Sequence, residues 1–176
     1  MCNVFNFNEY SSFNEDISSW DVSNVTNLAN LFNGAGNFSG DISSWNVSNV
    51  SNMNNMAKEA MKFNSDLSSW DVSNVNSMDR MFYHAYEFDS DLSNWNVSNV
   101  TTFLKMFEWS IKMDSELSGW DVSNATNMAE MFRSAESFNS DISGWNVSAV
   151  GNMAQIFKDA TSFDQDLSGW EVSNVN

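Results

Sequence analysis

The chain has 176 residues, of which 42% are hydrophobic and 14% aromatic, so it holds enough apolar material to form a folded core. Its net charge of −16 disfavours nucleic acid and anionic lipid as partners, because clustered Lys and Arg bind both, and it favours cations or basic proteins. Cys2 is the single cysteine, which excludes an internal disulfide, and no apolar run approaches the ~18 residues of a membrane span.

Residues 1–12 lack the tryptophan and methionine positions of the later chain, and we expect them to form a degenerate coil or an amino-terminal cap. From residue 13 onward the sequence repeats every 25 residues without insertion or deletion. This periodicity predicts a single domain over residues 13–176, made of about seven stacked coils with the last one truncated. The period is marked by Trp20, Trp45, Trp70, Trp95, Trp120, Trp145 and Trp170.

The first half of each repeat predicts a β-strand, as the segment 16–25 ("DISSWDVSNV") illustrates. Trp20 and Val22 alternate with polar residues, which is the period-two pattern of a strand with one buried face. The apolar positions also follow the L-x-x-L-x-L spacing of a leucine-rich repeat. They are Ile17, Trp20, Val22 and Val25.

The second half of each repeat predicts a short helix or helical turn. Leu28, Leu31, Phe32 and Ala35 lie at i, i+3, i+4 and i+7, the spacing of one helix face. Together the two halves predict a repeat solenoid, a leucine-rich-repeat-like right-handed coil with a parallel β-strand ladder on one side and short helices on the other.

The repeat unit also resembles a known family. The segments "DISSWDVSNVTNLANLF" and "ELSGWDVSNATNMAEMF" are similar to the 25-residue repeat of BspA-like leucine-rich-repeat surface proteins. The resemblance covers about residues 13–176 and implies a repeat solenoid that binds proteins or surfaces. A cell-surface or extracellular location is expected from this resemblance alone.

Charged residues are sorted by their position within the repeat. Residues 13–27 and the equivalent segments of later units hold 15 acidic residues and no basic one. The predicted strand face is therefore acidic, whereas the predicted helical side is nearly neutral. That side carries all seven basic residues, Lys58, Lys62, Arg80, Lys105, Lys112, Arg133 and Lys158.

One column of acids stands where the chain enters each predicted strand. We expect each carboxylate to accept hydrogen bonds from backbone N–H groups of its own turn, as Asp does in Asx turns. The alternative is a ladder of calcium sites between coils, but these turns lack the glycines of calcium-binding repeats, so no metal or cofactor is expected. The column consists of Asp16, Asp41, Asp66, Asp91, Glu116, Asp141 and Asp166.

A second column alternates acid and amide at the centre of the predicted strand face, and it is the predicted binding face. Placing Asn between Asp residues separates like charges to about 9.6 Å, and we expect each Asn to donate hydrogen bonds to the flanking carboxylates. Duplication of a pair of units would produce the same alternation. The column consists of Asp21, Asn46, Asp71, Asn96, Asp121, Asn146 and Glu171.

These patterns predict a non-enzymatic protein-interaction, adhesion or scaffold module that binds through its acidic Ser/Asn/Asp face, with a basic protein as the favoured partner. His84 is the single histidine and is expected at the surface, so no Ser-His-Asp set repeats along the chain. The alternatives are a calcium-binding acidic solenoid and a structural subunit of a larger complex. Such a subunit would dock through its variable helical side at Met61, Tyr83, Tyr86, Trp109 and Ile111.

Overall fold

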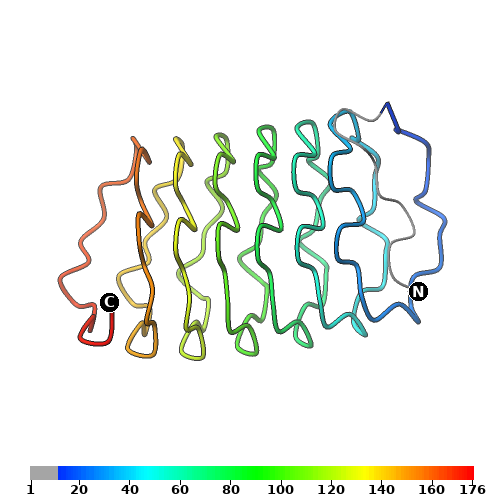
Figure 1. Cartoon of the computed structure of the whole chain (residues 1–176). Helices are drawn as coiled ribbons and strands as arrows, with labels where there is room; N and C mark the ends of the chain where they lie inside the picture. Colours follow the sequence, from blue (N-terminus) through cyan, green and yellow to red (C-terminus); the bar gives the residue numbers. More distant parts are fainter. Residues whose placement is uncertain (1–11) are drawn as a thin grey trace.

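The computed structural model describes residues 12–176, and in it successive 25-residue lengths of chain form coils that lie side by side in a row (Figure 1). The cap predicted over residues 1–12 lies outside the described residues apart from Ser12. Parallel bridges join residues 25 positions apart, so the period of the sequence is the period of the structure. The bridging residues are Asn27, Asn52, Ser77, Thr102, Asn127 and Asn152.

The secondary structure differs from the prediction. Residues 12–176 contain no helix and no strand, only these isolated single-residue bridges. The predicted leucine-rich-repeat-like solenoid, with a parallel strand ladder on one side and helical turns on the other, is therefore wrong. Turns make up most of the regular backbone instead.

The segment 16–25, predicted as a strand, forms two β-turns. The N–H of Trp20 donates to Ile17 O (3.1 Å) and the N–H of Val25 donates to Val22 O (2.8 Å). Its Asp and Ser residues favour this conformation because their side chains bond nearby backbone groups and so compete with a ladder. The predicted alternation of burial holds at Asp21 and Val22 but fails at Trp20, which is 39% exposed in this first described coil. In the next coil the equivalent Trp45 and Val47 are both buried.

The segment predicted as a helix forms two further turns, Leu28 to Leu31 and Phe32 to Ala35, each closed by an i+3 N–H to i C=O bond (3.1 and 2.9 Å). The third residue of each turn has positive φ, 61° at Asn30 and 77° at Gly34, as type II turns require. A left-handed residue in every four cannot continue a right-handed helix. The same two left-handed positions recur in later coils.

Backbone hydrogen bonds between coils hold these turns in register. Alternate N–H groups of one coil donate to carbonyls 24 residues later, as in Leu28 to Asn52 (3.0 Å) and Phe32 to Met56 (2.7 Å). The N–H groups in between donate within their own turns. Both kinds of bond are needed, because a buried backbone group without a partner costs about 1–3 kcal/mol.

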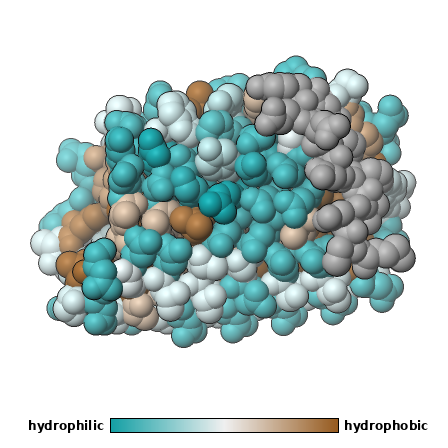
Figure 2. Space-filling model, in the orientation of Figure 1, coloured by the Kyte–Doolittle hydropathy of each residue, from teal (hydrophilic) through white to brown (hydrophobic). Residues whose placement is uncertain are grey.

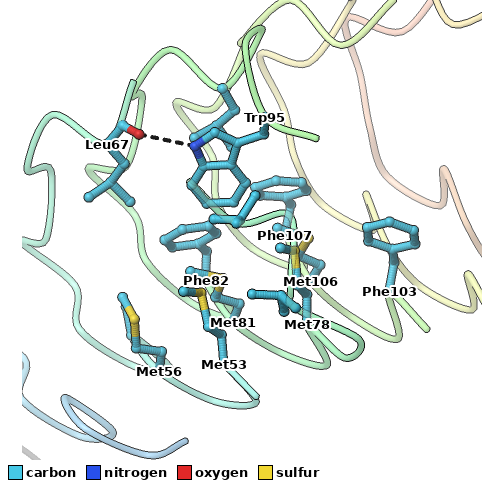
Figure 3. Packing of buried hydrophobic residues seen from close by; sticks show 14 of the residues in the cluster. Met53, Met56, Leu67, Met78, Met81, Phe82, Trp95, Phe103, Met106 and Phe107 are labelled. Carbon is cyan, nitrogen blue, oxygen red and sulfur yellow. Dashed lines mark hydrogen bonds between the residues drawn. The ribbon is translucent and has the colours of Figure 1, made fainter. Parts of the chain in front are cut away.

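Columns of identical side chains fill the interior. The indoles of Trp95, Trp120 and Trp145 stack in parallel, with centroids 6.3–6.4 Å apart and planes within 4°. Each indole Nε1–H from Trp45 onward donates to a carbonyl of the preceding coil, as Trp95 does to Leu67 (3.0 Å, Figure 3). The column therefore stabilises the stack by packing and by hydrogen bonding.

Phenylalanine and methionine fill the rest of the core (Figure 3). Phe82 and Phe88 stack within one coil at 3.8 Å, and Phe82 meets Phe107 of the next coil at 5.7 Å. Ala57 replaces Phe in its coil, and there Phe63 packs between the rings of the coils on either side. Met suits such irregular gaps because its side chain is unbranched and flexible.

In the part of the chain that the structure describes, no helix has the length and hydropathy to cross a membrane.

The tryptophan column gives a first prediction. Trp120→Phe removes the Nε1–H bond to Leu92 O (3.0 Å) and leaves a cavity in a fully packed column, so we expect a loss of about 2–4 kcal/mol in the free energy of unfolding. Urea denaturation measures it. The control Trp109→Phe alters a tryptophan that is 38% exposed and should change stability by less than about 0.5 kcal/mol. Equal losses in the two variants would contradict the role of the column.

Candidate binding surfaces

The first acidic column is bound to its own turns, as predicted. Each carboxylate accepts a hydrogen bond from the backbone N–H of the serine two residues later, at 2.8–3.0 Å, and Asp16 also accepts the hydroxyl of Ser18 (2.7 Å). The carboxylates are exposed but fixed in direction. The expected Asx-type turn is therefore confirmed in all seven coils.

A buried serine column supports these carboxylates, and the sequence analysis missed it. In each case the hydroxyl accepts a backbone N–H of the preceding coil at 2.7–2.9 Å, as Ser65 does from Ile42. Ser140 also donates to Glu116 of the preceding coil (2.8 Å). The available signal was a serine at the same position, next to the acid, in four successive units: Ser65, Ser90, Ser115 and Ser140.

The alternating column makes the same local turn, whether its member is acid or amide. Asp21 accepts the N–H of Ser23 (3.0 Å), and Asn46 accepts the N–H of Ser48 (3.1 Å) through the equivalent oxygen. No hydrogen bond joins neighbours of this column within residues 12–176, so the predicted bonds from Asn to flanking carboxylates are wrong. The side-chain oxygen of each member instead accepts the backbone N–H of the serine two residues later, within its own turn. All seven members are exposed.

The pKa values of the aspartates are lowered in both columns, but different effects oppose the lowering. Hydrogen bonds from Ser68 and Ser93 lower the pKa of Asp66 and Asp91, while the neighbouring carboxylate one coil away partly opposes this. In the alternating column, the hydroxyl and backbone N–H of the following serine lower the pKa of Asp21, Asp71 and Asp121, and only slight burial opposes them. Placing Asn between the acids thus relieves repulsion by distance.

Asparagines beside the alternating column hold the coils together. Asn49 Nδ2 donates to Ser23 O of the preceding coil (2.7 Å), and the later members repeat this bond at 2.7–2.8 Å. Ala149 interrupts the series. We call the two acidic columns together, held by these serine and asparagine bonds, the acidic face.

The variable segments, residues 28–37 and their equivalents, carry charges that cancel. A four-charge network joins two coils there: Lys105 pairs with Glu108 (3.0 Å) and Glu130 (2.8 Å), and Arg133 pairs with Glu130 (2.7 Å) and Glu108 (3.4 Å). Glu108 is only 3% exposed. A shallow hollow of about 390 Å³ lies beside the network. Its lining is Asn55, Lys58, Glu59, Arg80, Tyr83 and Lys105.

Three of the five residues predicted for a variable-side interface come together. Tyr83 stacks on His84 (4.2 Å between centroids), and His84 also meets Tyr86 (5.6 Å) and Trp109 (5.8 Å). His84 is thus the half-buried centre of a cluster rather than an isolated surface residue, and its burial lowers its pKa below 6.5, opposed mainly by Glu108. Met61 and Ile111 are partly buried.

The calcium ladder stays a prediction. In residues 12–176, no three His, Cys, Asp or Glu side chains lie close enough together to hold a metal ion. Asp66, Asp89 and Asp91 line a second shallow hollow between two coils. The side chain of Asp66 accepts a hydrogen bond from the backbone of its own turn.

The turn bonds give a second prediction. Asp91→Ala removes the oxygen that accepts the N–H of Ser93 (2.9 Å) and should lower the free energy of unfolding by about 1 kcal/mol at neutral pH. Asp91→Asn should lower it by less, because the amide oxygen can still accept that N–H, as Asn96 does in the wild type, and only the preference of the turn for a charged acceptor is lost. Urea denaturation of both variants is the measurement. Equal destabilisation would show that charge, rather than the turn bond, matters at this position.

The same bonds give a third prediction, on pH. The folded pKa values of the aspartates in the two acidic columns lie below the ordinary 3.8 because serine N–H and hydroxyl groups bond to them, so their stabilisation is complete above that pH and is lost as pH falls through the lower folded values. We expect the urea midpoint to fall steadily below about pH 4. Asp→Asn substitution in the first acidic column should weaken this dependence of the urea midpoint on pH. An unchanged dependence would contradict the assignment of the acid sensitivity to these carboxylates.

Comparisons with known proteins bear on the family. No curated protein matches the chain. The family described as "Mycoplasma protein of unknown function, DUF285" matches residues 1–118 and again residues 90–176, which together span the whole sequence. The resemblance to BspA-like leucine-rich-repeat surface proteins is therefore wrong as a family assignment. In agreement with this, residues 12–176 contain none of the strands and helices that the resemblance implied. The chain belongs to the DUF285 family.

Proposed function

We propose that the chain is a non-enzymatic binding or scaffold module whose acidic face binds a basic protein. The observation that supports this most directly is the fixed array of exposed aspartates, each held by a serine of its own turn. A surface that is already ordered loses little conformational entropy on binding. The segments that carry it hold no Lys or Arg to compete with a partner's cations.

The lowered pKa values support the same proposal. Asp21, Asp71 and Asp121 stay ionised to a pH below the ordinary 3.8 because serine bonds favour the charged form. A partner therefore meets a full row of negative charge at any physiological pH. Electrostatic attraction of this kind raises the association rate and depends strongly on salt.

The spacing of the alternating column indicates the shape of the partner. Its charges recur every second coil, and because the adjoining indoles of successive coils lie 6.3–6.4 Å apart, these charges are roughly 13 Å from one another. Lys or Arg residues at i and i+4 of an extended segment lie about 13 Å apart on the same side. A basic extended segment with cations at this interval can therefore pair with Asp21, Asp71 and Asp121 in one register.

The alternating column gives a fourth prediction. Asp21→Asn, Asp71→Asn and Asp121→Asn together remove three charges while keeping the turn, because the intervening Asn46 and Asn96 already make it. We expect the triple variant to bind an extended peptide with Lys at every fourth position about tenfold more weakly, with little change in melting temperature. Isothermal titration at low and physiological salt is the measurement.

Two outcomes separate the alternatives. A control peptide of the same composition with adjacent lysines should bind more weakly to the wild type than the spaced peptide does. If the triple variant binds the spaced peptide as the wild type does, the acidic face is not the binding surface. The structural-subunit alternative, with docking through Met61, Tyr83, Tyr86, Trp109 and Ile111, then takes its place.

A further inference from the structure

Trp109 combines two features that stability alone does not favour. Its backbone is left-handed, with φ of 62°, and its side chain is 38% exposed. Left-handed backbone costs free energy for any residue with a Cβ, but every described coil has it at this position, so the large exposed ring is what distinguishes Trp109 and points to a function. Gly34, at the same position three coils earlier, adopts this conformation without that cost.

The ring lies in a group of four that we call the aromatic cluster: Tyr83, His84, Tyr86 and Trp109. The hydroxyl of Tyr86 lies 3.2 Å from His84 Nδ1, which ties the cluster together. Lys58 stands over the ring of Tyr83 at 5.8 Å, so Tyr83 has a partner on this surface already. The rings that remain for a ligand are those of Trp109 and Tyr86, with His84 between them.

The backbone beneath Trp109 is held from the next coil. Its N–H donates to Arg133 O (2.9 Å), and the adjoining Glu108 is buried and paired with Lys105 and Arg133. The buried Ser110 on the other side donates to Phe82 O (2.6 Å). The indole is thus presented from a rigid support, which lowers the entropy lost when a ligand binds.

The surroundings of the cluster indicate a neutral, hydroxyl-rich ligand. Lys112 pairs with Glu87, the residue after Tyr86, and Lys58, which lies over the Tyr83 ring, pairs with Glu59 (3.0 Å), so the cluster is flanked by donors and acceptors whose charges cancel. The described variable segments hold as many acidic as basic residues. An anionic or cationic ligand would gain little from a balanced surface, whereas hydroxyl groups can bond to both members of such pairs.

The size and polarity of the cluster argue against a protein interface. It spans two neighbouring coils, about 5 Å apart, and a stable interface needs more than about 1,000 Å² with few charges at its centre. In Figure 2 hydrophilic residues cover most of the displayed face, and hydrophobic colour is confined to small patches. A sugar ring matches this scale, with an apolar C–H face for an indole and hydroxyls around its edge.

We propose that Trp109, with His84 and Tyr86, is a binding site for a neutral oligosaccharide. The indole packs against the C–H face of one pyranose ring, and the Glu87–Lys112 pair bonds hydroxyl groups at its edge. This site lies in the variable segments and uses no residue of the acidic face, so it is independent of the proposed basic partner.

The backbone of Trp109 offers a variant that separates binding from folding. Trp109→Gly removes the ring at a position that glycine suits, so the melting temperature should stay the same or rise. Cellohexaose, maltohexaose, chitohexaose and mannohexaose are the probes, each titrated to about 10 mM by calorimetry. We expect at least one to bind the wild-type chain and to lose at least about tenfold in affinity in Trp109→Gly.

Ser134→Gly is the matched control. Ser134 has the same left-handed backbone one coil later (φ of 56°) but is buried, so this variant should keep wild-type sugar affinity. The triple Asp→Asn variant of the acidic face should keep it as well. The proposal is overturned if no probe binds the wild type, or if Trp109→Gly binds as tightly as the wild type does.

Discussion

Hydrogen bonds between backbone groups 24 or 25 residues apart determine the rest of the structure. Because alternate N–H groups of each variable segment donate to the next coil, every coil must have the same length and the same turns. Side chains of one type are then superposed in columns, as the stacked rings of Trp95, Trp120, Trp145 and Trp170 illustrate. The acidic columns are a further consequence, since the register that aligns the core also aligns the carboxylates.

Burial could be predicted from the sequence, whereas backbone conformation could not. The i, i+3, i+4, i+7 spacing correctly predicted that Leu28, Leu31, Phe32 and Ala35 are buried, but two consecutive type II turns bury the same positions as a helix face does. Asn30 and Gly34 were the available turn signals. Later coils carry Arg, Lys, Glu and Trp at those positions. Because these residues do not favour left-handed backbone, residue propensities could not have predicted the turns in those coils.

On the candidate surfaces, too, some features could be predicted from the sequence and others could not. The own-turn bonds of Asp16 and its equivalents could be predicted, because an Asx turn needs only the local sequence. The buried serine column and the grouping of His84 with Trp109 could not, because both depend on which residues 23 to 25 positions apart become neighbours in space. Stacking thus produces one regular charged surface and, where the repeat varies, one irregular surface that holds the aromatic cluster.

The strict alternation of Asp and Asn has a consequence for how such a chain can change its length. Removing or adding one 25-residue coil would keep every backbone bond and every core column in register. It would also bring two aspartates, or two asparagines, into adjacent coils of the alternating column. Only a change by an even number of coils preserves both the packing and the charge pattern, so the electrostatic unit of this protein is 50 residues long although its structural unit is 25.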